Sequence, residues 1–159
     1  MAQLIICSKN KKNNLKDRIC NTLSKHKCTE YLREDKNNVI LNVKGNNTAK
    51  VVLLDYNSFC NEYKGNEYIY IVSSADKKSI KKLINIQSPV ITCGTSSKDT
   101  ISLASINGGT AVVSLQRKIE NLYGETIDPM DIKIELDTTD NVYHALATCT
   151  VSLLCGIEK

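Results

Sequence analysis

Short apolar runs alternate with polar and amphipathic segments along this chain, and this alternation constrains the fold most strongly. Each run is shorter than a helix and is rich in Leu, Ile, Val or Tyr, as expected of buried strands. Runs of this kind lie at residues 4–7, 39–43, 51–54, 68–72 and 90–93. Strands that alternate with helices predict an α/β domain, with a mostly parallel sheet flanked by helices.

Two segments between these runs have the spacing of surface helices. In the first, apolar residues recur at helical intervals from Leu15 to Leu23, after a polar stretch at residues 9–14. The second spans residues 76–86, and we expect Ile80, Leu83 and Ile84 to face inward while its lysines face largely outward.

The last third of the chain predicts a small antiparallel extension and a final helix. We expect strands at residues 101–106, 111–116 and 132–136, with Gly108-Gly109 as a hairpin turn between the first two. The helix should span residues 141–155, with Asp140 as its N-cap and Gly156 as its stop. Because this helix is apolar nearly all round, we expect the domain or a protein partner, including a second copy, to bury it.

The length and charge of the chain bound the classes to which it can belong. Its 159 residues fit a single domain over 1–159. No apolar run approaches the roughly 20 residues that span a bilayer, and no signal peptide is evident, so we expect a cytoplasmic protein. The net charge is +4, but residues 1–50 hold eleven Lys/Arg against four Asp/Glu, and residues 120–159 hold two against eight. The basic part leaves nucleic-acid binding open as an alternative, although stacking aromatics are sparse and no known motif is present.

The seven cysteines are odd in number and irregularly spaced, and most lie inside apolar runs. Reduced, buried thiols fit this pattern better than a disulfide framework. Cys93 is the best candidate for a nucleophile, although no histidine lies near it in sequence.

Two stretches resemble the central domain of the Mur ligases, the ATP-dependent amide-bond ligases of peptidoglycan synthesis. The first is Val90-Ile91-Thr92-Cys93-Gly94-Thr95-Ser96-Ser97-Lys98-Asp99 with the following strand, which is similar to the family's strand-Gly-polar-Asp segment. The second, Asp140-Asn141-Val142-Tyr143-His144-Ala145-Leu146-Ala147-Thr148, is similar to the family's HN-x-x-N-A-x-A-A helix. Together they cover roughly the last 70 residues. The resemblance implies a Mur-like α/β fold and a link to the cell wall. The abundance of Lys, Asn and Ile indicates a bacterial source with an AT-rich genome.

The resemblance also implies where an ATP site would lie, and the sequence there departs from the family. In place of a Gly-rich loop the chain has Ser8-Lys9-Asn10-Lys11-Lys12-Asn13-Asn14, without a glycine to let the backbone wrap a phosphate. Remnant phosphate contacts would fall to Lys9, Lys11 and Lys12. Asp55 occupies the position of the family's acidic metal ligand, although a carboxylate that caps a loop or is solvated there is the more common case at a strand end.

Thr95, Ser96 and Lys98 follow the strand at 90–93 and are a second candidate anion site, at a strand end. This segment lacks the glycine before the lysine that a phosphate-binding loop would have.

These departures predict a non-catalytic Mur-ligase-like domain, a pseudoenzyme that serves as a binding, regulatory or assembly module and forms homo-oligomers. No cofactor is expected. The alternative is a nucleotide- or phosphate-ligand-binding protein that retains residual Mg·ATP binding through the lysines and Asp55.

Overall fold

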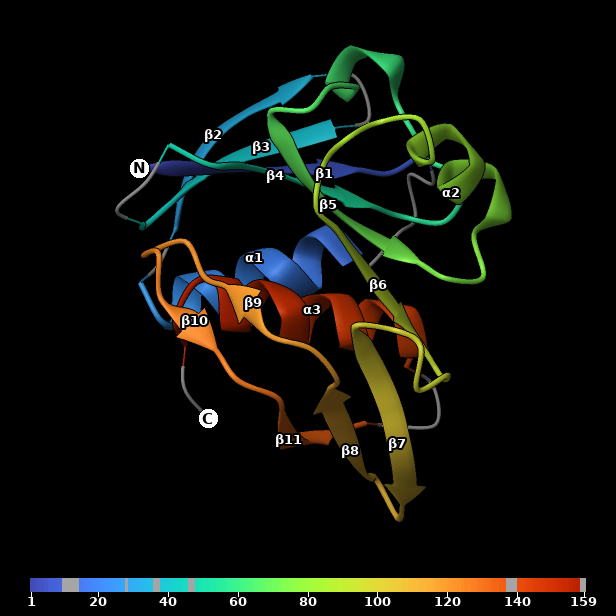
Figure 1. Ribbon diagram of the computed structural model, residues 1–159. Helices are drawn as coiled ribbons and strands as arrows, with labels where there is room; N and C mark the ends of the chain where they lie inside the picture. The colour runs from blue at the N-terminus through green and yellow to red at the C-terminus, as the bar shows by residue number, and fades with distance from the viewer. Residues whose placement is uncertain (10–14, 28, 36–37, 46–47, 137–139, 158–159) are drawn as a thin grey trace.

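The computed structural model describes residues 1–9, 15–27, 29–35, 38–45, 48–136 and 140–157. Its centre is a nine-stranded sheet with the order β11-β8-β7-β6-β5-β4-β1-β3-β2 (Figure 1). The strands are β1 (Ala2–Cys7), β2 (Thr29–Asp35), β3 (Asn38–Val43), β4 (Lys50–Leu54), β5 (Tyr68–Ser73), β6 (Val90–Gly94), β7 (Ile101–Asn107), β8 (Thr110–Leu115) and β11 (Met130–Glu135). A separate two-stranded sheet pairs β9 (Ile119–Glu120) with β10 (Thr126–Ile127).

The central strands β7, β6, β5, β4 and β1 run parallel, and antiparallel strands flank them on both sides. The α/β class and the antiparallel extension formed by β7, β8 and β11 are therefore confirmed. At the opposite edge, β3 and β2 add an antiparallel pair. The strand at residues 39–43 was predicted and corresponds to β3, whereas β2 was not predicted. The Gly108-Gly109 turn is also confirmed, since both residues have positive φ (58° and 87°), as a tight hairpin turn requires.

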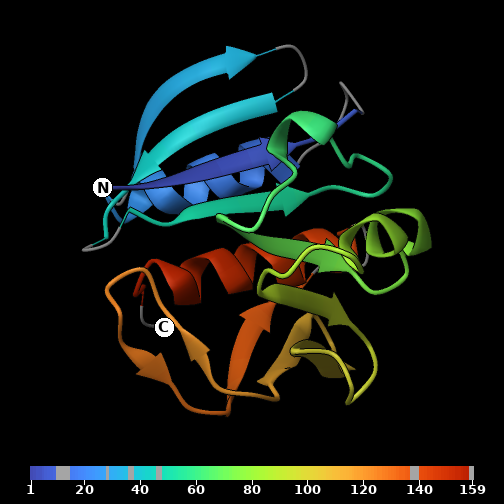
Figure 2. The same cartoon turned by 45° about the horizontal axis from the view of Figure 1, so that its top comes forward.

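The helices divide between the two faces of the sheet (Figures 1 and 2). Helices α1 (Leu15–Lys25) and α3 (Val142–Leu154) lie side by side on one face and enclose the larger core. The short 3-10 helix η1 (Asn61–Tyr63) and α2 (Lys77–Leu83) cover the smaller core on the other face.

Helix α3 is buried almost all round by the chain itself. Its residues from Ala145 to Ser152 are buried, and its apolar members belong to the larger core. The apolar character of this helix is thus explained without a second chain, and the protein partner expected at residues 141–155 remains a prediction.

Three details of the helices differ from the sequence prediction. Helix α2 ends earlier than Ile86, and Ile84 is 72% exposed instead of facing inward. The N-cap of α3 is Asn141, whose side chain accepts a hydrogen bond from the His144 amide (3.1 Å). Asp140, the predicted cap, instead forms an ion pair with Arg18 of α1 (3.3 Å), because one residue of offset turns its side chain away from the first free amides.

Candidate functional site at the strand ends

The carboxyl ends of the parallel strands meet at one edge of the sheet, where α/β proteins usually bind their ligands. Ser8 follows β1, Asp55 follows β4, Ser74 follows β5, and Gly94 ends β6. Because β1, β4, β5 and β6 are neighbours in the sheet, their ends form a continuous row. Of the positions predicted to contact phosphate or metal, the described ones (Lys9, Asp55, Thr95, Ser96 and Lys98) fall along this row.

The Asp55 carboxylate is the centre of a hydrogen-bond network at this edge. One oxygen accepts from Ser8 Oγ (3.0 Å), and the other accepts from the Tyr56 amide (2.9 Å). The second oxygen also lies 3.0 Å from His144 Nε2, which comes from the first turn of α3. The Asp55 side chain is 9% exposed and that of His144 is 14% exposed. Asp55 is therefore a nearly buried carboxylate that the chain's own groups satisfy.

The ionisation of Asp55 follows from these contacts. Burial raises the pKa of the carboxyl, but hydrogen bonds from His144, the Tyr56 amide and Ser8 together outweigh it. The net effect is a pKa below the ordinary value, so the carboxylate stays charged at neutral pH.

His144 and Tyr143 are placed by the capped first turn of α3. The Tyr143 hydroxyl donates to the carbonyl of Leu54 (2.5 Å), at the end of β4, and lies 3.4 Å from the carbonyl of Ile71 in β5. Burial raises the pKa of Tyr143 well above its ordinary value, so the hydroxyl remains a donor. Adjacent helix residues thus fix the start of α3 against two parallel strands.

Asp76 is a second buried carboxylate in the row, and its role is structural. It is fully buried after β5, and its oxygens accept from the Ser79 amide (3.2 Å) and the Asn57 amide (2.9 Å). It therefore caps α2 and fixes the loop after β4, as an N-cap aspartate does.

The loop after β6 closes on a third buried carboxylate, Asp99, which accepts a hydrogen bond from the Ser96 amide (3.1 Å). A Cβ at Gly94 would overlap the Ser74 hydroxyl and the Asp99 carboxylate, so only glycine allows this close approach. The predicted anion ligands Thr95, Ser96 and Lys98 are exposed on this loop. Because the Ser96 amide already faces a carboxylate, the loop is poorly arranged for an anion.

The structure separates the two groups of predicted phosphate ligands. Lys9 is exposed after β1, and its amide donates to Ser58 Oγ in the loop after β4 (2.9 Å). The loop with Thr95, Ser96 and Lys98 follows β6, three strands away, which at the usual strand spacing is roughly 14 Å. Lys11 and Lys12 lie outside the described residues.

Other chemical candidates find little support at this edge. Among the described residues, no group of three or more His, Cys, Asp and Glu side chains could hold a metal ion. The metal contact predicted for Asp55 stays a prediction. Cys93 is fully buried against Thr150, and burial raises the pKa of its thiol to about 12, which excludes it as a ready nucleophile. Tyr68 and Tyr70 share one strand face, but both are buried and cannot stack on bases.

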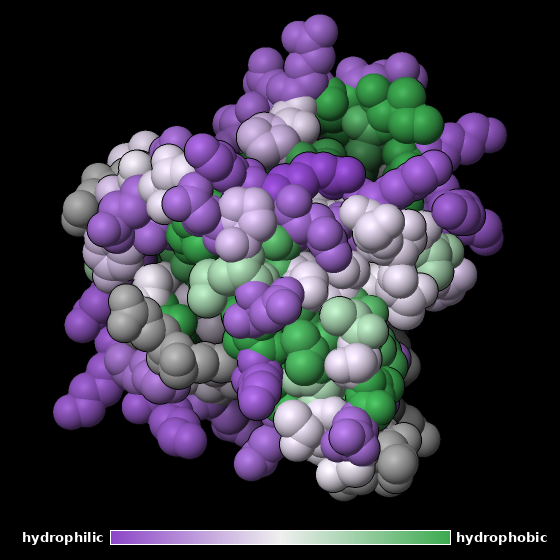
Figure 3. Space-filling model, turned by 60° about the horizontal axis from the view of Figure 1, so that its bottom comes forward, coloured by the Kyte–Doolittle hydropathy of each residue, from purple (hydrophilic) through white to green (hydrophobic). Residues whose placement is uncertain are grey.

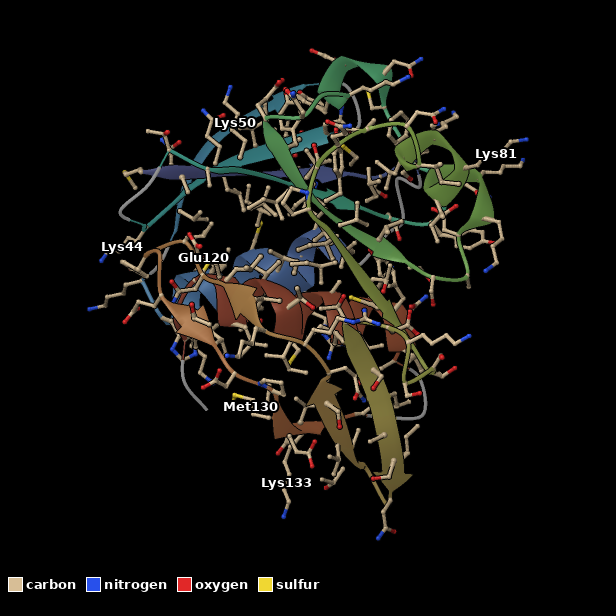
Figure 4. All side chains as sticks on the ribbon, in the orientation of Figure 1. Lys44, Lys50, Lys81, Glu120, Met130 and Lys133 are labelled. Carbon is tan, nitrogen blue, oxygen red and sulfur yellow. The ribbon has the colours of Figure 1, made fainter. Side chains whose placement is uncertain are left out.

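The described cysteines form no disulfide, as predicted. Four of them are buried (Cys7, Cys93, Cys149 and Cys155), and Cys20 and Cys60 are partly buried. The lysines of α2 are exposed, and Lys81 projects away from the fold (Figure 4).

The sequence analysis assigned no role to His144, which it named only as part of the helix motif. Residues 55 and 144 are 89 positions apart, and no local pattern links them. The sequence did place Asp55 directly after a predicted strand and His144 near the start of a predicted helix. Both ends lie at the same edge of an α/β sheet, and this was the available signal.

No protein-family model matches the chain, and no curated protein matches its sequence. In the part of the chain that the structure describes, no helix has the length and apolar character needed to cross a membrane.

Proposed function

We propose that this protein is a Mur-ligase-like α/β domain that works as a binding module and does not catalyse ligation. The family resemblance lies in two stretches of sequence, which fold as β6 with its Asp99 loop and as α3. Their residues support the family, whereas the loop after β1 lacks the glycines that its ATP chemistry would need.

The observation that carries the proposal is the state of Asp55. A carboxylate that holds a nucleotide-bound Mg²⁺ must offer an oxygen to the ion, and magnesium demands near-octahedral oxygen coordination. Here both oxygens accept hydrogen bonds from the chain's own Ser8, Tyr56 and His144. The His144 imidazole occupies the place beside the Asp55 carboxylate that a bound cation would take. This favours a structural role for Asp55.

The experiment is thermal unfolding with and without excess Mg·ATP. A ligand at about 100 times its dissociation constant stabilises the folded state by about 2.7 kcal/mol, which shifts the Tm by several degrees for a domain of this size. We expect no shift. A saturable shift that Lys9→Ala abolishes would instead support the alternative, a phosphate-ligand-binding protein with a remnant ATP site.

A further inference from the structure

A cavity of about 700 Å³, lined by none of the strand-end residues, lies between the β10–β11 segment and the last turns of α3. This volume is within the usual range of ligand-binding clefts. Its apolar lining includes Ile127, Met130, Ile132, Leu153 and Ile157. Figure 3 views this side of the molecule, where apolar surface is surrounded by hydrophilic side chains.

The open edge of β11 borders this cavity. β11 lies at the end of the nine-stranded sheet and pairs with β8, and no other strand in the described chain pairs with its outer edge. Its residues Met130, Asp131, Ile132 and Lys133 line the cavity. An open strand edge presents unpaired backbone groups that can accept a further strand.

The phase of β11 shows which backbone groups face outward. The Leu136 amide, just beyond the strand, donates to the Gly109 carbonyl beside β8 (2.9 Å). Because ladder bonds alternate in an antiparallel pair, the backbone groups of Ile132 and Ile134 face β8. Those of Asp131, Lys133 and Glu135 therefore face the open edge, and the side chains of these three residues are exposed.

The side chains around the cavity give it an acidic character. Glu125, Asp128 and Asp131 line it, with Lys133 as the basic residue of the lining. Asp128 also pairs with Lys118 (3.7 Å), and Asp131 accepts a hydrogen bond from Ser114 Oγ (2.6 Å), so a net negative charge remains at the rim. The carboxyl end of α3 also faces this region, and the last turn of the helix holds no basic residue to offset its negative dipole. The cavity thus suits an occupant that carries positive charge and apolar groups.

We propose that an extended peptide segment of a partner protein binds here, adding a strand to the outer edge of β11. Its backbone would bond to Asp131, Lys133 and Glu135, and alternate apolar side chains would enter the cavity beside Ile132 and Leu153. Basic residues in the segment would meet the acidic rim. The inference rests on the proposed binding function and assigns it to a surface that is separate from the strand ends.

The test selects ligands from a phage-displayed library of random eight-residue peptides against the whole protein. We expect enriched sequences in which apolar residues alternate with polar ones and basic residues predominate. Amide hydrogen exchange followed by NMR should show fast exchange at Asp131, Lys133 and Glu135 in the free protein. A synthetic form of the selected peptide should slow exchange at these three amides, whereas Ile132 and Ile134 should be protected throughout.

Two comparisons make the test specific. Two peptides are N-methylated at alternate residues, one at the odd and one at the even positions. One of them should lose binding and the other should keep it, because only one set of peptide amides faces β11. Charge reversal by Asp131→Lys should weaken binding about fivefold or more, whereas Glu120→Lys, on exposed β9 outside the cavity, should not (Figure 4).

The proposal is overturned if no peptide is enriched. It is also overturned if the two N-methylated peptides, one modified at odd and one at even positions, bind equally well. It is also overturned if the free protein is a dimer whose Asp131, Lys133 and Glu135 amides are already protected, which would assign this edge to a second copy. None of these outcomes involves Mg·ATP, so a failure here is distinguishable from a failure of the proposed function.

Discussion

The imidazole of His144 lies 3.0 Å from the carboxylate of Asp55 and joins the first turn of α3 to the end of β4. Both side chains are nearly buried, and Ser8 at the end of β1 contacts the same carboxylate. One carboxylate therefore connects two neighbouring parallel strands with the helix that covers them. A position that could hold a ligand serves here as a tertiary contact.

Removal of the imidazole should destabilise the protein. His144→Ala leaves Asp55 charged with one fewer partner, and hydrogen bonds to charged groups are worth about 1.5–3 kcal/mol. We expect a loss of that size in urea unfolding, and a much smaller loss for the matched change at exposed His26, His26→Ala. Equal losses for both variants would contradict the contact as described.

The contribution of Asp55 should depend on pH in a defined direction. Its pKa in the folded protein is lowered, so the stabilisation is present above the unfolded pKa of about 3.9 and is lost as the pH falls through the folded pKa. The stability difference between wild type and Asp55→Asn should thus be constant above about pH 5 and shrink below about pH 4. The measurement is urea unfolding of both proteins from pH 7 to pH 2.5, and a difference that grows on acidification would oppose this assignment.

Gly94 should tolerate no larger residue. The Cβ of Gly94→Ala would overlap Ser74 Oγ and Asp99, and overpacking of this kind typically costs about 1–3 kcal/mol. Gly65→Ala is the matched control, because its Cβ would meet only the mobile end of the Glu67 side chain. Thermal unfolding should rank Gly94→Ala well below Gly65→Ala, with partial recovery in the double variant Gly94→Ala/Ser74→Gly.

The N-cap of α3 offers a test of the corrected helix start. Asn141→Ala removes the acceptor of the His144 amide and should cost about 1 kcal/mol. Asn141→Ser keeps a good capping side chain and should retain most of the stability. If the two variants unfold at the same denaturant concentration, Asn141 does not cap the helix.

Thiol reactivity should follow burial. Burial raises the pKa of Cys7 and of Cys93 to about 12, so neither should be alkylated in the folded protein at pH 8. Among the cysteines that the structure describes, the half-buried Cys20 and Cys60 should react first with iodoacetamide. Peptide mapping by mass spectrometry checks the order, with protein unfolded in guanidinium as the control, and early labelling of Cys93 would contradict its burial.

Much of this fold could be predicted from local patterns. β1 and β4 contain continuous apolar runs because these central parallel strands are covered on both faces, and α1 shows its buried residues at helical spacing. β2 could not be recognised, because its TEYLRED sequence is mostly polar and its conformation depends on pairing with β3. β9 and β10 are two residues each, which is too short for any periodic signal.

The candidate site was less accessible to sequence reasoning than the fold. The apolar run at residues 51–54 places Asp55 at a strand end, but its contact with His144 depends on how α3 packs across the sheet. Likewise, Asp140 and Asn141 are both good capping residues, and only the backbone geometry decides between them. Ile84 fits the helical stripe, but α2 ends at Leu83 and leaves it outside the core.

The most direct test of the account is a titration of isotope-labelled protein with Mg·ATP, following the backbone amides by NMR. The amides of Lys9, Tyr56, Ser96 and His144 report on the strand-end row, which would have to hold a nucleotide. We predict that none of them shifts saturably at millimolar Mg·ATP. Concerted, saturable shifts of these amides, with the signal of exposed Glu120 in β9 unchanged, would contradict the account and show that a nucleotide site survives.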